Sequence, residues 1–313
     1  MATGTTVNSD MVIYDRSVQT AYLERIQDVI QVFNAQSQGA IVLRNENIEG
    51  NFDKEAIYTL ATEVAHRNVN SVSGQTAEKF GSDEIIAVKC PWKMPVVQST
   101  EESFKRRNRS ITEQAMLYGQ QLADSVLSYQ VEAAVASLGG AIGGNSDMVV
   151  TGSWTTDGKK VLTRALRTFG DASERLVLWL MHSSDFFDVV DDAITEKLFG
   201  EIGVVVYGGM PGTLGRPVLV TDKATEGVIY GLQRGAVDIV ESQPPGLANE
   251  RVTGLENLVL RSQAEGTFNV GVLGYSFAGS ANPDNTALGA VSNWTQYAIS
   301  DKATAGVQLT VTS

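Results

Sequence analysis

The sequence predicts an α+β protein organised around one long helix. Residues 110–138 contain no proline and repeat apolar side chains every three or four positions, which indicates a helix of about 28 residues and roughly 42 Å. Residues 175–182 form a continuous apolar run, which is typical of a strand buried on both faces. The pattern of residues 255–275 predicts two long extended segments. With a length of 313 residues, these elements fit one large domain or two modest ones.

The composition excludes several classes of protein. Hydrophobic residues make up 43% of the chain, which is ample for a core and excludes a disordered protein. Cys90 is the only cysteine, so a disulfide framework is excluded. His66 and His182 are the only histidines, so the chain has almost no thiolate or imidazole ligands for a zinc site. The net charge of −12 argues against binding nucleic acid through overall charge. Without a recognisable signal peptide or membrane span, we expect a soluble chain from a reducing compartment.

The N-terminal elements follow from short local patterns. Residues 1–10 are polar and predict a flexible arm. Residues 17–33 carry apolar side chains with a period near 3.6, which predicts an amphipathic helix. Residues 39–43 are small and β-branched and predict a short strand.

The next region, up to residue 108, is loosely patterned. We expect a helix over residues 54–68 and extended pieces over residues 84–89 and 94–98. Pro91 and Pro95 place the extended pieces at a sheet edge, because proline cannot donate a ladder hydrogen bond. Structureless excursions of this length are uncommon in compact domains, so the region is expected to have a function of its own.

The long helix has clear boundaries in the sequence. Ser110 and Glu113 have the spacing of a capping box, and Gly139-Gly140 is expected to end the helix. Gly119 costs about 1 kcal/mol relative to alanine within a helix, which a close packing neighbour would explain. The only charges of this helix are acidic: Glu113, Asp124 and Glu132. A helix with so few charges is expected to contact protein on more than one side.

The remaining elements alternate. Helices are predicted over residues 159–169 and 183–199, and the shorter strands over 204–207, 217–221, 228–232, 236–241 and 306–311. The extended segments 255–264 and 267–275 flank Glu265-Gly266, which predicts a hairpin, although the two arms can also pair elsewhere. A short helix carrying Trp294 is expected to begin at Pro283.

The sequence offers little catalytic chemistry. The glycine-rich residues 208–215 lead into a strand rather than a helix, which argues against a phosphate loop. Residues 274–279 miss the nucleophile-elbow spacing by one residue. Asp188, Asp191 and Asp192 fit a solvated helix face better than a cation site. We therefore predict no catalytic residue, no metal ligand and no cofactor.

One dense basic run stands out. It consists of Lys105, Arg106, Arg107 and Arg109, and it follows Glu101 and Glu102 directly. Three interpretations remain open for it: a solvated run, salt bridges between subunits, and a weak nucleic-acid patch. The candidate intersubunit contacts are these six residues together with Trp92.

The order of these parts is more informative than any motif. An arm and helix, a long excursion, a capped spine-like helix, an α/β stretch and two extended arms resemble, in this order, the tailed-phage major capsid proteins with the Hong Kong 97 fold. The local sequences that resemble this family are 165–171, 176–183, 215–222 and 283–288 with Asn293-Trp294 and Gly306. The resemblance covers roughly residues 15–311.

The resemblance implies a division of the chain. Residues 1–38 would be the N-arm and N-terminal helix, 39–109 the E-loop region, 110–150 the spine helix of the P-domain, 151–248 the A-domain, and 249–313 the returning P-domain strands and C-terminal segment. Some relatives crosslink an E-loop lysine to a neighbouring asparagine. Lys79, Lys89 and Lys93 lie in the matching region, but no motif selects one of them.

The resemblance also implies an assembly. Subunits would form a homo-oligomer of pentamers and hexamers in an icosahedral shell, with E-loops lying over neighbours. The shell would enclose packaged double-stranded DNA, contacted non-specifically. A separate scaffolding protein, a portal and, in some relatives, a decoration protein are the implied partners, and no membrane is involved. The protein would be assembled in the host cytoplasm and reside in the virion.

Other classes of function compete with this interpretation. An encapsulin-like nanocompartment shell has the same fold but contains protein cargo. An α/β enzyme using Asp188 or Asp192 would need a concave site with perturbed carboxylates. A tail-tube protein would be richer in strands and lack the long helix. We expect a structural protein rather than an enzyme.

Overall fold

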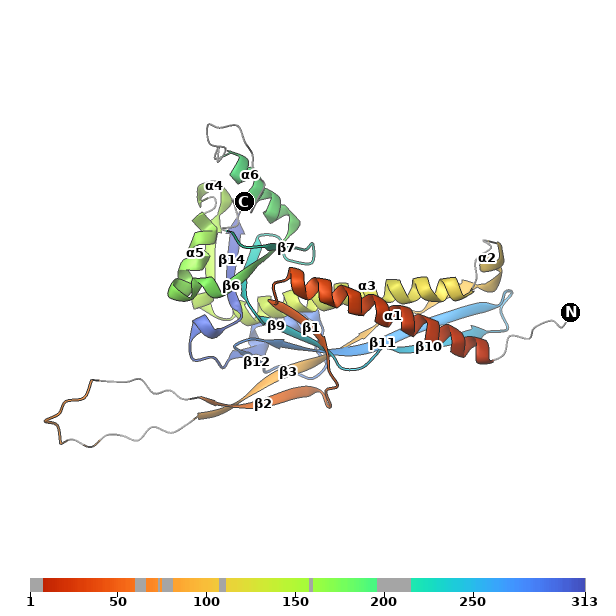
Figure 1. The fold of residues 1–313 in the computed structure, drawn as a ribbon, viewed down its shortest axis with the longest axis horizontal. Coiled ribbons are helices and arrows are strands. Elements are labelled where there is room, and N and C mark those ends of the chain that lie inside the picture. The colour runs from red at the N-terminus through yellow and green to blue at the C-terminus, as the bar shows by residue number, and fades with distance from the viewer. Residues whose placement is uncertain are drawn as a thin grey trace.

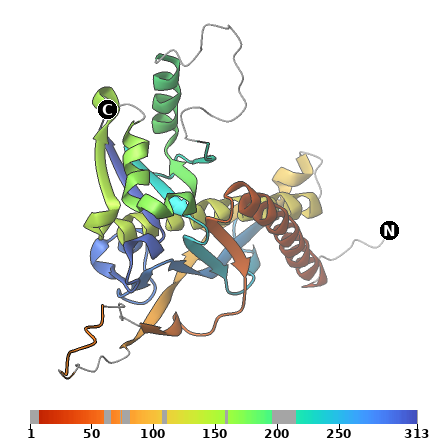
Figure 2. The same cartoon turned by 60° about the vertical axis from the view of Figure 1, so that its left-hand side comes forward.

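The computed structural model describes residues 8–59, 66–72, 74, 81–106, 111–157, 160–195 and 215–312. Figure 1 shows an elongated molecule in which the long helix α3 (Ile111–Gly143) runs beside α1 (Asn8–Gln36) along an extended sheet. A compact α/β lobe stands at one end of α3, and a hairpin of β2 (Phe52–Thr59) and β3 (Gly81–Lys93) projects away from it. Figure 2 shows that the lobe, the helix pair and the hairpin extend in different directions.

The described strands form two sheets. Along the main path of the nine-stranded sheet lie β1 (Ile41–Asn45), β9 (Val237–Glu241), β11 (Val259–Val272), β12 (Tyr275–Phe277) and β13 (Trp294–Gln296). β10 (Gly246–Val252), β3 and β4 (Val97–Thr100) also pair with β11, and β2 pairs with β3. The sheet of the lobe has the order β5 (Val149–Ser153), β14 (Gly306–Thr312), β8 (Val228–Gln233), β6 (Leu176–Met181) and β7 (Val218–Val220).

The structure confirms most of the predicted elements. The remaining helices are α2 (Glu101–Arg106), α4 (Trp154–Asp157), α5 (Lys160–Phe169), α6 (Ser183–Thr195) and α7 (Asn285–Leu288). The expected helices at 17–33 and 159–169, and the expected strands at 39–43, 175–182, 217–221, 228–232, 236–241 and 306–311, are all present in outline. Ser110, the strand at 204–207 and the glycine-rich residues 208–214 lie outside the described residues, as do residues 1–7 and 196–199. Within the described residues, no helix combines the length and apolar character that a bilayer crossing requires.

Two predictions near the N-terminus are wrong. α1 begins at Asn8, so residues 8–10 are helical and not part of an arm; Asn, Ser and Asp favour a first helical turn. The helix expected over residues 54–68 is not formed, because residues 52–59 are strand β2 and residues 66–68 are irregular. β2 pairs antiparallel with β3, and Phe52 lies opposite Val88. The distant partner β3 therefore decides the conformation that local composition left ambiguous.

The hairpin expected around Glu265-Gly266 is also wrong. β11 passes through both residues without a turn, and β3 pairs with it so that Gly266 lies opposite Trp92. A Cβ atom on Gly266 would lie 2.5 Å from the Trp92 ring. The glycine therefore permits close approach of an indole ring rather than a reversal of the chain. Pro91 lies in the same part of β3, where pairing to β11 on one side fits the predicted edge position.

Gly266→Ala is expected to lower the free energy of unfolding by about 1–2 kcal/mol, because the added methyl group overlaps the Trp92 ring. Chemical denaturation measures this difference. Gly271→Ala in the same strand is the control, since its Cβ would meet only Ala87 at 3.4 Å. Equal losses of stability in the two variants would contradict the assignment.

The glycines of α3 mark close packing along its length. A Cβ on Gly119 would lie 2.5 Å from the Val18 carbonyl oxygen, which confirms the expected packing neighbour. Gly140 does not end the helix, contrary to the prediction, since α3 continues to Gly143. A Cβ on Gly140 would clash with the Leu288 carbonyl oxygen and lie 2.8 Å from the Trp294 ring. Gly140 therefore admits the C-terminal segment rather than stopping the helix.

The sequence predicts that Trp294 lies on the short helix. This prediction is wrong, because Trp294 belongs to β13. Its indole Nε1 donates a hydrogen bond to the Leu288 carbonyl oxygen at 2.7 Å, and its ring packs edge-on against Phe277. Asp284 rather than Pro283 caps α7, accepting from the Ala287 amide. These contacts hold Leu288 and Trp294 in the positions that pack against Gly140 of α3.

The buried side chains divide into one large cluster and two small ones. The large cluster joins the C-terminal half of α3 to both sheets. The first small cluster contains Tyr22, Ile26, Leu122, Ala123, Val126 and Ala264, and the second contains Tyr14, Val18, Ala115, Tyr118 and Leu260. Both small clusters lie between α1, α3 and the sheet. The end of the molecule far from the lobe therefore has little core of its own.

Candidate subunit-contact surfaces

The hairpin of β2 and β3 projects from the rest of the molecule (Figure 1). Residues of both its faces are mostly exposed, and Tyr58 near its end is 80% exposed. A two-stranded ribbon is at best marginally stable in water without a partner surface. In the described residues, β2 pairs only with β3, so its outer edge is open.

The two faces of this hairpin differ in charge. The register places Asp53 opposite Ala87, Glu55 opposite Ile85, and Asp83 opposite Ile57, so three carboxylates share one face. The other face carries the ion pair of Lys54 and Glu84, at 2.8 Å. We refer to Asp53, Glu55 and Asp83 as the acidic face. The three carboxylates repel one another, and a basic partner surface would relieve this repulsion.

Four predicted contact residues lie at the opposite end of the molecule, on α2. Glu101 accepts from Arg251 Nη2 at 2.9 Å, and both side chains are half-buried. Arg106 and Glu102 form an exposed pair one helical turn apart, at 3.2 Å. Lys105 belongs to α2 by its backbone. Arg107 and Arg109 lie outside the described residues.

The sequence prediction missed Arg251. It lies on β10, and the tertiary fold brings it to Glu101 over 150 positions of the chain. Nothing in the local sequence around Arg251 distinguishes it from other strand residues. Within one chain, Glu101 pairs with Arg251 and Glu102 pairs with Arg106.

Trp92 lies apart from α2, in the wall of a groove between the β3–β4 connection and α3. The groove has a volume of about 450 Å³. Its lining is mostly apolar, with Lys93 as the one cation: Pro91, Trp92, Lys93, Met94, Pro95, Leu122, Ser125, Val126 and Tyr129. The Trp92 Nε1 atom is buried and has no hydrogen-bond partner in the described part of the chain. The structure therefore separates Trp92 from the charged candidates.

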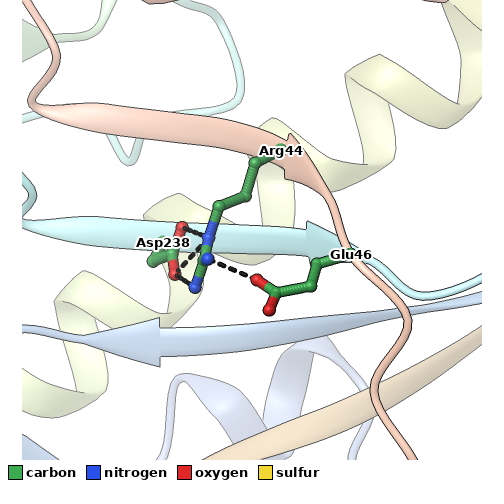
Figure 3. Close-up of polar contacts among 3 residues, drawn as sticks. All are labelled: Arg44, Glu46 and Asp238. Carbon is green, nitrogen blue, oxygen red and sulfur yellow. Dashed lines mark hydrogen bonds and ion pairs between the residues drawn. The ribbon is translucent and has the colours of Figure 1, made fainter.

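A third charged cluster secures the point where the chain leaves the sheet for the hairpin. Arg44 on β1 donates three hydrogen bonds to the Asp238 carboxylate on β9, from Nε to both oxygens at 3.0 Å and from Nη2 at 2.6 Å. Its Nη1 atom lies 2.5 Å from Glu46 (Figure 3). The bond to Asp238 raises the pKa of the Arg44 guanidinium. The sequence prediction missed this cluster because its partners are 194 positions apart.

The residues weighed as catalytic candidates have structural surroundings. His182 Nδ1 contacts Ser184 Oγ at 2.8 Å and accepts from the Ser184 amide at the start of α6. Burial raises the pKa of the Cys90 thiol to about 12. Asp188 is exposed, and the Asp192 side chain lies outside the described part. Among the described residues, no three His, Cys, Asp or Glu side chains are grouped as metal ligands would be.

Comparisons with known proteins agree with this arrangement. A family model described as major capsid protein 13-like matches residues 10–308. The solved capsid of a native GTA particle has a TM-score of 0.55 and 12% identity, over 76% of this chain and 86% of that chain. The capsid of cyanophage P-SCSP1u has a TM-score of 0.52 and 9% identity over 88% of both chains.

The mature capsid of bacteriophage PhiM1 is similar to the same extent, with a TM-score of 0.51 and 10% identity over 88% of this chain and 86% of that chain. At these identities the likeness shows a common fold. A sequence search of curated proteins gives no match.

Proposed function

The chain belongs to the major capsid protein 13-like family, and on that premise we propose that its copies assemble as pentamers and hexamers of an icosahedral shell that encloses double-stranded DNA. The observation that carries the proposal is the family match over residues 10–308, nearly the whole chain. The prediction of a phage major capsid protein with the Hong Kong 97 fold is confirmed by this match and by the fold shared with phage capsids.

The same match decides between the alternatives raised by the sequence. It favours a phage capsid protein over an encapsulin-like nanocompartment shell. The family is structural, and we propose accordingly that the chain is not an enzyme. The surroundings of Asp188 support this proposal, because an exposed carboxylate on a helix lacks the concave site that catalysis requires.

We propose that the predicted division of the chain describes its parts in the shell. The projecting β2–β3 hairpin would serve as the E-loop, α3 as the spine helix and the α/β lobe as the A-domain. The outer part of the hairpin is mostly exposed and projects away from the core, which supports a role in contacting neighbours. A separate scaffolding protein, a portal and non-specifically contacted DNA are further proposed partners, with assembly in the host cytoplasm.

The contact residues follow from charge. We propose that Lys105, Arg106, Arg107 and Arg109 bind the acidic face of a neighbouring subunit's hairpin. The hairpin and helix α2, which carries Lys105 and Arg106, lie at opposite ends of the elongated molecule, which suits a head-to-tail contact that closes into rings. Complementary charges of this kind fix register between copies more than they add affinity. Trp92 is proposed as a separate apolar contact, within its own groove and apart from these charges.

The basic run is tested by Lys105→Ala, Arg106→Ala, Arg107→Ala and Arg109→Ala combined. We expect the yield of particles to fall by about tenfold or more, because a loss of about 1.4 kcal/mol of binding free energy at an interface weakens association tenfold. Sedimentation of the expressed protein measures the yield. Arg167→Ala with Arg175→Ala removes two exposed positive charges from the lobe and controls for loss of surface charge elsewhere on the chain. An unchanged yield in the fourfold variant would exclude the basic run as a contact.

A further inference from the structure

Helix α1 is held by two kinds of contact. It packs on α3 through apolar side chains and through the notch at Gly119. It is fastened to the sheet by hydrogen bonds between side chains far apart in the sequence. Tyr22 Oη donates to Glu241 Oε1 at 2.6 Å, and Asn249 Nδ2 donates to Asp15. The contact to the sheet is therefore polar and includes a carboxyl group.

Tyr22 and Glu241 are almost fully removed from solvent. Their exposed fractions are 1% and 7%. On the sheet, the neighbour opposite Glu241 is Phe268 on β11, and the residues that follow β9 are uncharged. The ionisable groups that face the Glu241 carboxyl are Tyr22 from α1 and Glu46 from the segment after β1. Among the described residues around it, no cation compensates a charge on Glu241.

A small cavity connects this buried pair to solvent. It has a volume of about 240 Å³ and lies between α1, the segment after β1 and the segment after β9. Leu23, Asn47 and Gln243 line it together with Glu241. A space of this size and polarity admits several water molecules, so protons can reach the carboxyl without unfolding of the sheet.

Ionisation of Glu241 opposes the docked position of α1. Burial raises the pKa of Glu241, and the hydrogen bond from Tyr22 lowers it by a smaller amount. The pKa of Tyr22 is raised as well, by burial and by the Glu241 charge, so Tyr22 keeps its proton and remains the donor. A carboxyl whose folded-state pKa is raised contributes its full stability below its unfolded pKa. That contribution is lost as the pH rises through the folded-state pKa.

The packing around this pair lowers the free energy needed to detach α1 from the sheet. The N-terminal two thirds of α1 rest on the two small clusters and not on the large core. Parts of a protein with little buried apolar surface open at lower free energy than the rest. We propose that Tyr22 and Glu241 form a proton-controlled latch, which holds α1 on the sheet at acidic pH and loosens it as the pH rises.

Hydrogen exchange of the full chain, corrected for the intrinsic pH dependence of exchange, tests the latch. In the wild-type chain, protection of the α1 amides is expected to fall by up to about tenfold for each pH unit between the ordinary glutamate pKa and the raised folded-state pKa of Glu241, and to level off above the folded-state pKa. Glu241→Gln, which is neutral at every pH, is expected to abolish this slope. Tyr22→Phe, which removes the donor, is expected to lower protection of α1 above that pKa further.

The control is Glu250→Gln, an exposed carboxyl on the neighbouring strand β10, which should leave the slope unchanged. A wild-type slope of zero overturns the latch, and so does a slope that persists in Glu241→Gln. Loss of the slope in Glu250→Gln would assign it to general charge on the sheet and also overturn the latch. None of these readouts depends on shell formation, so they are independent of the proposed function.

Discussion

Gly140→Ala is expected to lower the free energy of unfolding by about 3 kcal/mol, at the upper end of the range for overpacking. The added methyl group would meet the Leu288 carbonyl oxygen and the Trp294 indole at once. Trp294 cannot rotate away freely, because its Nε1 is bonded to Leu288 and its ring packs on Phe277. Thermal and chemical denaturation of the chain measure the loss.

The matched control lies one turn further along α3. Gly143→Ala places a Cβ no closer than 3.4 Å to the Gln308 side chain, so it is expected to be neutral or slightly stabilising through helix propensity. If Gly140→Ala were as stable as Gly143→Ala, close packing of the C-terminal segment on α3 would not be the reason for the glycine.

Reversal of the acidic face is expected to abolish shell formation while leaving the fold intact. Asp53→Lys, Glu55→Lys and Asp83→Lys together would bring the hairpin against the basic run with like charge, which costs several kcal/mol at an interface. The three side chains project from an exposed ribbon, so the melting temperature should change little. Particle yield by sedimentation and melting by calorimetry separate the two effects.

A charge swap tests more specifically whether the acidic face binds the basic run. Adding Lys105→Glu and Arg106→Glu to the reversed hairpin is expected to restore part of the yield, because the pair of surfaces is again complementary. The control is Lys54→Glu with Glu84→Lys, which exchanges the ion pair on the opposite face and should assemble normally. Failure of the swap to restore any particles would mean that the acidic face binds some other surface.

The sequence predicted those elements whose signals are local. The apolar run that became β6 and the periodic segments that became α1, α3 and α5 needed no information from elsewhere in the chain. The failures share a physical cause, since each depends on a distant partner. Gly266 suggests a turn when the sequence is considered alone, but in the structure the Trp92 ring packs against it. Gly140 likewise suggests a helix end, but in the structure Leu288 packs against it.

The candidate surfaces show the same division. The basic run was visible as a charge pattern, and its neighbour Glu101 was named with it. The partner that binds Glu101 within the chain, Arg251, is 150 positions away and could not be found. Tyr22 and Glu241 are separated by 219 positions, and neither belongs to a pattern that suggests the other. Hydrogen bonds and ion pairs between residues far apart in the chain therefore could not be predicted from a single sequence.

The central claim, assembly into a shell, is tested most directly by size-exclusion chromatography with negative-stain electron microscopy. The chain would be expressed alone and together with a candidate for the proposed scaffolding protein. The account predicts hollow shells or ring-shaped pentamers and hexamers in at least the co-expressed sample. A chain that remains a stable 33.6 kDa monomer in both samples would contradict it.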